Sequence, residues 1–305
     1  MELLEGHMRV FRSGMSYGFE ELDEATSGLN KGDLTVVASR PGVGKTSFAM
    51  NIALHAAALG KKVIYFSAQH EKKYLEACFA LQKFLCGNYD ERMSKIHIED
   101  AVPLSVDGIK KVLESKQDVD LVIIDYYQLL YCEKKKNRTL ELAFISAELK
   151  KIAFYLEIPI ICLTQLGRWW KIGTRPKLSD MDEPIGALVQ DSDTFLFLQR
   201  EPNSNKAECV VAKARYGKRN KVINLKWQAS RLRFSDGKAC SFEDGVNFYR
   251  DIGKVLLSDN PLDIDLRREL RLELMEKYNL TEIEAVNVLN GRNISDYVSK
   301  YKKRV

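Results

Sequence analysis

Residues 38–46 read Ala-Ser-Arg-Pro-Gly-Val-Gly-Lys-Thr, and this stretch decides how the rest of the chain folds. A short apolar run at residues 34–37 precedes it, and a segment with helical spacing follows at residues 47–59. The order of strand, glycine-bearing loop and helix is the order that a phosphate-binding loop requires. Backbone N–H groups at the start of such a helix are unpaired, and with the helix dipole they attract an anion. The sequence therefore predicts a nucleotide site at this loop.

The residue types within the loop suit a bound nucleoside triphosphate. Gly42 and Gly44 permit a close approach of phosphate that a Cβ atom would hinder. Lys45 is expected to reach the β- and γ-phosphates, and Thr46 to place its hydroxyl on Mg²⁺. Ser39 departs from the strict pattern, which has glycine there, and the alternative is an ordinary turn whose lysine is solvated. The predicted nucleotide-binding residues are Arg40, Pro41, Gly42, Val43, Gly44, Lys45, Thr46 and Ser47.

The composition is that of a globular protein with enough apolar residues for a sizeable core. Of the 305 residues, 45% are hydrophobic and 29% are charged, and the formal net charge is +5. We expect neither a membrane span, which needs roughly 20 apolar residues, nor a signal peptide. The six cysteines lack zinc-ligand spacing, so we expect reduced thiols in a cytoplasmic protein. They are Cys78, Cys86, Cys132, Cys162, Cys209 and Cys240.

Apolar runs alternate with helical segments through much of the chain, which predicts a parallel sheet with right-handed crossovers. The expected strands lie at residues 62–67, 119–125 and 158–164, and the expected helices at 72–84, 106–115 and 140–156. Closely spaced strands then favour antiparallel hairpins that extend the sheet. These strands are expected at residues 194–198, 208–212, 222–227 and 232–234. Charged helical segments follow at residues 263–278, 281–289 and 294–302.

Two strand ends carry polar side chains that suit the same site. Asp125 ends an apolar run, and we expect this strand to lie beside the phosphate-loop strand. An acid there is suited to hold the water shell of Mg²⁺, although a lone acid often only ends a strand. Thr164 and Gln165 close the next strand. The glutamine amide is expected to contact the γ-phosphate and report its loss.

Further short stretches accompany the loop in a fixed order between residues 16 and 236. With Arg40-Pro41 they are Gly18-Phe19, Leu22-Asp23, Thr26-x-Gly28-Leu29, Ile124-Asp125-Tyr126-x-Gln128-Leu129, Thr164-Gln165-Leu166-x-Arg168, Gln190-Asp191-x-Asp193 and Lys213-x-Arg215. In this set the chain resembles the bacterial replicative DNA helicases of the DnaB type. The expected fold is α/β: a RecA-like P-loop ATPase core with a mostly parallel central sheet, an antiparallel β extension and a C-terminal helical appendage. The expected domains are an N-terminal arm at residues 1–17, the ATPase domain at 18–240 and a helical tail at 241–305.

The resemblance implies a ring, expected to be a hexamer, that binds ATP and Mg²⁺ between subunits. The residues implied to act within one subunit are Lys45, Thr46, Asp125 and Gln165, with Thr46 and Asp125 at the metal. Lys213 and Arg215 would reach the γ-phosphate of the neighbouring subunit, where Arg215 stabilises transition-state charge. Without the resemblance, the pair reads as a solvated basic strand end.

Two positions depart from the pattern of that family. The strand after the loop helix usually ends in Ser-x-Glu, whose glutamate positions the attacking water, but this chain has Ser67-Ala68-Gln69. An amide takes no proton, so hydrolysis should be slow unless Glu71 approaches the same side of an extended strand. The loop at residues 179–190 usually has arginine before glutamate, whereas this chain has Asp182-Glu183-Pro184. An acid repels DNA phosphate, which disfavours DNA binding there.

The candidate DNA-binding residues combine cations with aromatic rings, a mixture that binds single strands by charge and stacking. They are Arg168, Trp169, Trp170 and Lys171, with Glu183 and Gly186 from the loop at residues 179–190. The alternative is that the tryptophans pack against a neighbouring subunit or the core. Residues 213–233 hold eight basic residues and no acid, which favours either a nucleic-acid channel or a solvated strand face.

Three hypotheses follow from these residues. The leading one is an ATP-dependent DNA helicase that translocates along single-stranded DNA and contacts a primase or loader. The second is a nucleotide-binding switch or assembly protein with the helicase fold and little turnover, because of Gln69 and Asp182. The third is a recombinase-like filament ATPase, because the RecA-like core is shared.

Overall fold

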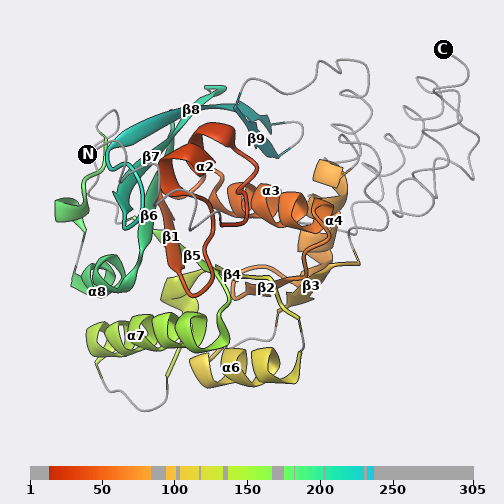
Figure 1. The fold of residues 1–305 in the computed structure, drawn as a ribbon, viewed down its shortest axis with the longest axis vertical. Helices are drawn as coiled ribbons and strands as arrows, with labels where there is room; N and C mark the ends of the chain where they lie inside the picture. Colours follow the sequence, from red (N-terminus) through yellow and green to blue (C-terminus); the bar gives the residue numbers. More distant parts are fainter. Residues whose placement is uncertain are drawn as a thin grey trace, which may run out of the picture. The chain divides into compact units, whose positions relative to one another are not determined.

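The computed structural model describes residues 14–83, 94–100, 104–116, 118–132, 137–166, 175–181, 183–201, 204–229 and 232–236. Within these ranges, nine strands form one sheet in the order β3-β2-β4-β5-β1-β6-β7-β8-β9 (Figure 1). The strands are β1 (Leu34–Ser39), β2 (Val63–Ser67), β3 (Ile96–Glu99), β4 (Leu121–Asp125), β5 (Ile160–Gln165), β6 (Thr194–Arg200), β7 (Lys206–Ala214), β8 (Lys221–Gln228) and β9 (Arg233–Ser235). The helices are α2 (Glu20–Thr26), α3 (Lys45–Ala58), α4 (Lys72–Lys83), α6 (Val106–Ser115), α7 (Arg138–Leu156) and α8 (Glu183–Asp191), with 3₁₀ turns η1 (Tyr127–Leu129) and η2 (Leu178–Asp180).

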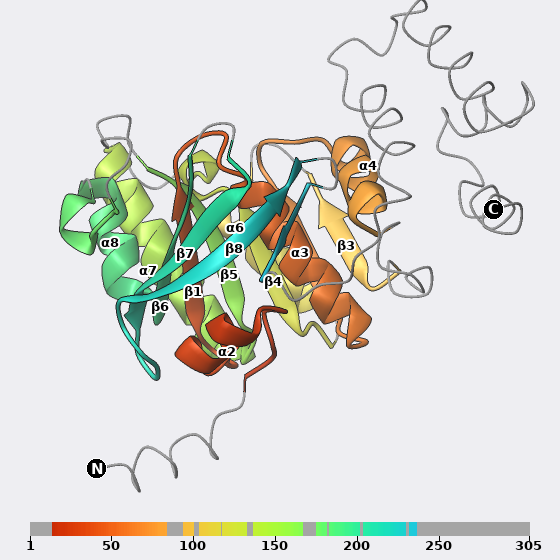
Figure 2. The same cartoon turned by 90° about the horizontal axis from the view of Figure 1, so that it is seen from above.

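The phosphate-loop strand β1 lies inside the parallel part of the sheet. Its neighbours are β5 and β6, and its last residue, Ser39, is paired with Gln165 and Leu198. Every residue of β1, β2 and β4 is buried, which explains their largely apolar sequences. From β6 onward the pairing is antiparallel through β7, β8 and β9 (Figure 2). The predicted parallel sheet with an antiparallel extension is confirmed.

One predicted neighbour relation is wrong. The strand that ends at Asp125 was expected beside β1, but β5 lies between β4 and β1. The order of parallel strands is set by the crossover connections, which leave no mark in the apolar run itself. Asp125 still reaches the phosphate loop, because parallel strands all end at the same edge of the sheet.

Helices cover both faces of the sheet (Figure 1). On one face α3 contacts the parallel strands, and its buried Phe48 stacks on Phe19 with ring centroids 5.0 Å apart. On the other face α6, α7 and α8 share a core with the strands, to which they contribute Ile109, Leu149 and Leu188. Burial of each such side chain contributes about 1.5–3 kcal/mol relative to exposure. Packing on both faces thus holds the strand ends, and the loops that follow them, in place.

Residues 183–191 form helix α8, where the sequence analysis expects a loop at 179–190. A proline such as Pro184 is compatible with the first turn of a helix, where its missing N–H is not needed. Ile185 and Leu188 follow one helical turn apart, and both are buried in the core. The proline and this spacing are the local signals of the helix. Glu183 and Gly186 therefore lie on α8 and not in a loop.

The chain divides into two compact units. The second includes α4 from Lys73 onward and residues 229 and 232, and within it Gln82 Nε2 donates to the Leu232 carbonyl at 2.6 Å. The first unit contains the sheet, the phosphate loop and the other described helices. The candidate site lies entirely within this first unit.

Four of the cysteines lie in the described ranges, and there they are buried and free of disulfides: Cys78, Cys132, Cys162 and Cys209. In those ranges no helix is long and apolar enough to cross a membrane. Cys86 and Cys240 lie outside the described residues, as do most of the arm at 1–17 and the whole tail at 241–305. The domain boundaries therefore stay predictions.

Candidate nucleotide site

The phosphate loop passes from β1 into α3 through two glycines with positive φ. Gly42 has a φ of 75° and Gly44 a φ of 111°, conformations that glycine adopts without strain. A Cβ atom on Gly44 would lie only 3.0 Å from Cζ of Phe234. Helix α3 begins at Lys45, directly after this turn. Its first unpaired N–H groups therefore belong to the loop, where they are available to an anion.

We expect Gly44→Ala to destabilise the fold by about 1–3 kcal/mol, because alanine is strained at this φ and its Cβ presses on Phe234. Gly60→Ala is the matched control, since its φ is 78° but nothing in the described structure lies within 4 Å of the added Cβ. Urea unfolding and binding of a fluorescent ATP analogue measure both variants. Only Gly44→Ala should weaken nucleotide binding, and equal losses of affinity in both variants would contradict this geometry.

Lys45 is nearly buried in the first turn of α3, with 9% of its surface exposed. Its Nζ lies 5.4 Å from the centroid of the Tyr126 ring. Burial lowers the pKa of Lys45 below its ordinary value, while the negative charge of Asp125 acts in the opposite direction. A partly desolvated ammonium gains from an anion that replaces its lost water. A nucleotide phosphate in the loop would supply that anion.

Asp125 is buried at the end of β4 and accepts two hydrogen bonds on one oxygen. Thr46 Oγ1 donates to Oδ2 at 2.8 Å, and Tyr65 OH donates to the same atom at 2.9 Å. The other oxygen, Oδ1, is buried and has no hydrogen-bond partner among the described residues. A buried carboxylate oxygen without a partner is costly unless a cation meets it. Because Mg²⁺ prefers such oxygen ligands, Asp125 and Thr46 fit the metal of a magnesium nucleotide.

Gln165 ends β5 beside Ser39 and is held through its backbone by Gln128. Gln128 Nε2 donates to the Gln165 carbonyl at 2.8 Å, and Gln128 Oε1 accepts from the Gln165 N–H at 3.1 Å. Neither bond uses the side-chain amide of Gln165, which stays a candidate for γ-phosphate contact. Gln128 is therefore a positioning residue, a role that the sequence analysis does not assign to it.

Gln69 and Glu71 follow β2 without extending it. The strand ends at Ser67, whose Oγ accepts from the His70 N–H at 3.0 Å and donates to the His70 carbonyl at 2.6 Å. In this turn the chain is no longer extended, so side chains no longer alternate between the two faces of a strand. Glu71 is therefore not brought to the side of Gln69 by an extended strand. Both side chains are exposed.

His70 is a half-buried residue near this site that the sequence analysis does not single out. Burial lowers the pKa of its imidazole, the charge of Asp125 raises it and the charge of Lys45 lowers it. The imidazole therefore lies within electrostatic range of the two groups that define the site. Its sequence signal is only its place next to Gln69.

Arg200, at the end of β6, contacts the phosphate loop from a distant part of the chain. Its Nη2 donates to the Gly42 carbonyl at 3.1 Å and its Nε to the Val43 carbonyl at 3.4 Å. The guanidinium carbon lies 5.3 Å from the centroid of the Trp227 ring. Arg200 thus ties the loop backbone to β6. The partners in these two contacts are separated by 157 and 158 positions in the sequence, so no local pattern predicts them.

Lys213 and Arg215 lie toward the end of the sheet where the parallel strands begin, whereas the phosphate loop lies where those strands end. Lys213 is paired with Phe195, which lies beside Val36 of β1, and the residue before Arg215 is paired with Thr194, which lies beside Thr35. At roughly 3.3 Å per residue, these two positions lie about 10 and 13 Å along β1 from its last residue, Ser39. Neither cation therefore serves the phosphate loop of its own chain. This separation is compatible with the predicted role in a neighbouring subunit.

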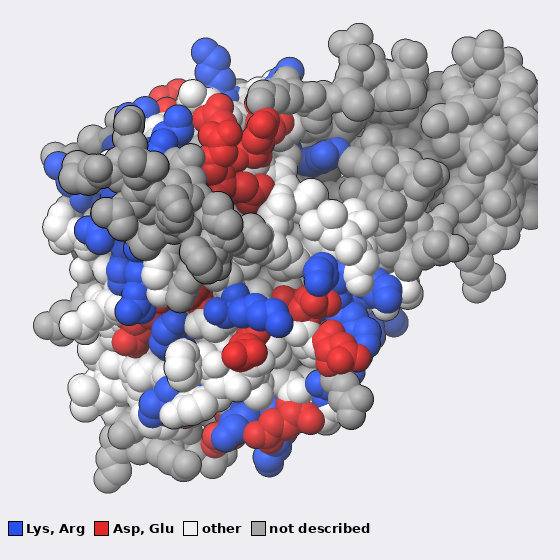
Figure 3. Space-filling model, in the orientation of Figure 1, with Lys and Arg blue, Asp and Glu red and all other residues white. Residues whose placement is uncertain are grey.

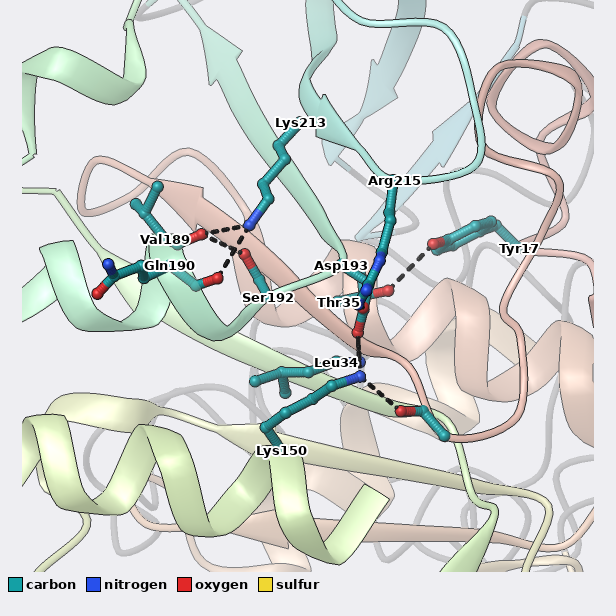
Figure 4. A network of polar contacts seen from close by, with 11 residues as sticks. Tyr17, Leu34, Thr35, Lys150, Val189, Gln190, Ser192, Asp193, Lys213 and Arg215 are labelled. Atoms are coloured by element: carbon teal, nitrogen blue, oxygen red, sulfur yellow. Dashed lines mark hydrogen bonds and ion pairs between the residues drawn. The ribbon is translucent and has the colours of Figure 1, made fainter. Parts of the chain in front are cut away.

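Both cations are engaged within their own chain (Figure 4). Lys213 Nζ donates to the carbonyls of Val189 and Gln190, at 2.7 and 3.1 Å, in the last turn of α8. Arg215 Nη1 donates to Asp193 Oδ1 at 3.1 Å. A merely solvated strand end does not describe Lys213, because it is half-buried at a helix C-terminus, where a cation is favoured.

The predicted DNA-binding residues are described only in part. Four of them, Arg168, Trp169, Trp170 and Lys171, lie outside the described residues, so their role stays a prediction. Positive and negative side chains are mixed over the described part of the face in Figure 3. The net charge of +5 is therefore not gathered into one positive field on the described part of that face.

The fold and the loop geometry define a RecA-like P-loop domain. Residues 14–88 and 82–236 match the family model of the DnaB-like helicase C-terminal domain. The chain belongs to this family, which confirms the resemblance found in its sequence.

Individual relatives agree with this assignment. A protein named probable replicative DNA helicase, from Trieres chinensis, is 34% identical over 275 residues, which cover 77% of this chain and 60% of the relative. The structure of a DnaB-like replicative helicase, described with its interactions with primase, is 28% identical at a TM-score of 0.65 and covers 73% of this chain and 63% of that one. A second solved structure, of an ATPase domain, is 26% identical at a TM-score of 0.67 and covers 76% of this chain and 96% of that one. The chain thus spans less than two thirds of the Trieres relative.

Proposed function

We propose that this chain is the ATPase motor domain of a replicative DNA helicase, which binds Mg-ATP between subunits of a ring and moves along single-stranded DNA. The observation that carries the proposal is the 2.8 Å contact between Thr46 and Asp125, with Asp125 Oδ1 available to a cation. Both groups lie at the phosphate loop, next to the partly desolvated Lys45. Membership of the DnaB-like family supports the same function.

The groups of one subunit bind and orient the nucleotide. The loop N–H groups and Lys45 stabilise charge on the β- and γ-phosphates as the terminal bond breaks. Thr46 and Asp125 hold Mg²⁺, which neutralises phosphate charge when it is bound. The Gln165 amide contacts the γ-phosphate, and the two backbone bonds from Gln128 hold it in position.

Two cations of the next subunit complete the site. Lys213 and Arg215 lie roughly 10–16 Å along the sheet from the end of β1 that carries their own loop, so they act on a nucleotide bound by a neighbour. A head-to-tail interface of this kind forms a closed ring when the rotation between neighbouring subunits is a whole fraction of a full turn. We propose a ring of six subunits. Arg215, with 61% of its side chain exposed, is the group that stabilises transition-state charge.

The DNA-binding residues of this proposal are Arg168, Trp169, Trp170 and Lys171, together with Glu183 and Gly186 of α8. The carbonyls at the end of α8 bind Lys213, which supports a route from DNA to the neighbouring γ-phosphate. Interactions with primase are described for the solved DnaB-like helicase. We propose a primase or loader as a partner of this chain as well.

Filter binding tests the proposal. We expect the protein to retain labelled ATP with Mg²⁺ and to retain a single-stranded oligonucleotide better than a duplex of the same length. DNA affinity should fall as salt rises, because phosphate contacts release counterions. Single-stranded DNA should also raise steady-state ATP hydrolysis. Retention of neither ATP nor single-stranded DNA would overturn the proposal.

Gln69 favours a second candidate, a switch that binds ATP and assembles but turns it over little. The amide replaces a group that takes a proton, and the described structure does not bring Glu71 to its side. DNA-stimulated hydrolysis at ordinary helicase rates in the unmodified protein would exclude this candidate. A recombinase-like filament has no comparable observation in its favour, and electron microscopy with DNA distinguishes closed rings from open filaments.

A further inference from the structure

Asp193 is a buried acid that forms ion pairs with two cations. It lies where the parallel strands begin, at the end of the sheet away from the phosphate loop. Its side chain is 2% exposed and lies between α8 and β6. Lys150 Nζ donates to Oδ2 at 2.5 Å, and Arg215 Nη1 donates to Oδ1 at 3.1 Å (Figure 4). The Leu34 N–H also donates to Oδ2, at 2.9 Å. One carboxylate thus connects helix α7, strand β1 and the residue that follows β7.

The two cations are held differently. Lys150 is 25% exposed and also donates to the Gly32 carbonyl at 2.8 Å, whereas Arg215 is 61% exposed. A buried carboxylate without a cation is strongly destabilised, and Lys150 keeps Asp193 compensated when the charge of Arg215 is shared with another anion. A guanidinium has five N–H donors. One bond to Asp193 therefore orients Arg215 and leaves other donors for a second anion.

Backbone hydrogen bonds connect the same residues to the phosphate-loop strand. The Asp193 N–H donates to the Leu34 carbonyl at 2.8 Å, and the Arg215 N–H donates to the Asp193 carbonyl at 2.9 Å. Leu34 is the first residue of β1, whose other end carries the loop. The position of Arg215 is thus coupled, through Asp193, to the strand that supports the nucleotide site of its own subunit.

We propose that Asp193 is a positioning residue for Arg215, which keeps one N–H on Asp193 while its other donors reach the γ-phosphate bound by the neighbouring subunit. Lys150 is the permanent counter-ion of Asp193. This inference rests on the proposed function, in which Arg215 acts on a neighbour. Without a nucleotide next to it, Arg215 is held by Asp193 at the edge of the sheet. With ATP there, the γ-phosphate accepts hydrogen bonds from the other donors of the guanidinium, and Lys150 keeps the buried acid compensated.

A stability cycle tests the two-cation arrangement without nucleotide. Lys150→Met and Arg215→Met each leave one cation on Asp193, so each should change the equilibrium constant for urea unfolding by less than roughly tenfold. In the double variant, the change in this equilibrium constant should exceed the product of the two single changes by roughly tenfold or more, because the buried acid then has no cation. Adding Asp193→Asn should remove that excess. Effects that simply multiply would overturn the assignment of Lys150.

Nucleotide dissociation tests the positioning role without hydrolysis. The probes are a fluorescent non-hydrolysable ATP analogue and the matching ADP analogue. Asp193→Asn and Arg215→Ala should each speed dissociation of the ATP analogue by roughly tenfold, because a charge-assisted contact to the γ-phosphate is lost. The ADP analogue lacks that phosphate and should dissociate at the native rate. Asparagine keeps an acceptor for the Leu34 N–H, so a general loss of structure is not expected.

Mixed rings separate the inference from the proposed function. An excess of Lys45→Ala subunits, which carry an intact Arg215 but hold no nucleotide, should restore slow ATP-analogue dissociation to both variants. If slow dissociation returns in mixed rings with Arg215→Ala but not in those with Asp193→Asn, the inference is overturned, while the role of Arg215 on a neighbouring subunit stands. Restoration of neither would overturn that role and the inference with it.

Discussion

Lys45→Ala is expected to lower ATP hydrolysis by at least roughly 10²–10³-fold, the loss that follows removal of one preorganised charge donor from a water-excluded site. Lys45 is 9% exposed, and burial lowers the pKa of its ammonium. The group is therefore held where water compensates it poorly, and its favourable partner is the phosphate charge that grows in the transition state. Steady-state hydrolysis and binding of a fluorescent ATP analogue measure the effect.

Lys62→Ala is the matched control for this prediction. Lys62 lies just before β2, has 48% of its side chain exposed and pairs with Asp118 at 3.3 Å. Exposed pairs of this kind contribute little to stability, so hydrolysis and thermal unfolding should both stay close to native. Lys45→Ala should likewise unfold near the native temperature while its nucleotide affinity falls. Hydrolysis by Lys45→Ala that matched Lys62→Ala would contradict the role assigned to Lys45.

The elements of the sheet were predictable because their signals are local. The apolar run and glycine loop predicted β1 and α3, and helical spacing predicted residues 106–115, which are α6. Helix α8 escaped prediction because its signal, Pro184 followed by two apolar residues one turn apart, is short. The order of β4, β5 and β1 depends on how crossovers pack, and no stretch of sequence records that order.

The residues of the candidate site also fall into those with a local signal in the sequence and those without one. Lys45 and Thr46 were predictable from adjacent residues, and Asp125 from the end of its apolar run. The supporting groups were not, because each acts through a partner far away in the chain: Gln128 holds a residue 37 positions away, and Asp193 binds Lys150, 43 positions away. A motif marks that such residues matter, but only the fold shows what they touch.

Strand β1 relates two halves of the proposed mechanism. Its end carries the loop that binds the nucleotide of one subunit, and its first residue bonds to Asp193, which holds Arg215 for the next. All six residues of β1 are buried and closely packed, so we expect a shift at its loop end to move its first residue as well. We therefore expect nucleotide binding in one site to alter the position of the arginine offered to another.

Gln69→Glu is expected to raise ATP hydrolysis by at least about tenfold, in keeping with a general-base contribution of roughly 10²–10⁴. Ser67, the last residue of β2, is paired with Asp125, so residue 69 follows the strand end that adjoins the acid proposed to bind the metal. A glutamate there can take a proton from the attacking water, whereas a glutamine can only hydrogen-bond to it. Because Gln69 is exposed, the substitution should leave thermal unfolding near native. Steady-state hydrolysis with and without single-stranded DNA measures the gain.

Glu71→Gln, in the native chain and in Gln69→Glu, is the control for this gain. It should change neither rate, because β2 ends at Ser67 and does not bring Glu71 to the side of residue 69. An unchanged rate in Gln69→Glu would contradict the catalytic position assigned to residue 69. His70→Gln would then distinguish the remaining possibilities, because burial lowers the pKa of His70 and so favours the neutral imidazole, which is able to accept a proton. Slower hydrolysis in His70→Gln would transfer the role of base from residue 69 to the imidazole beside it.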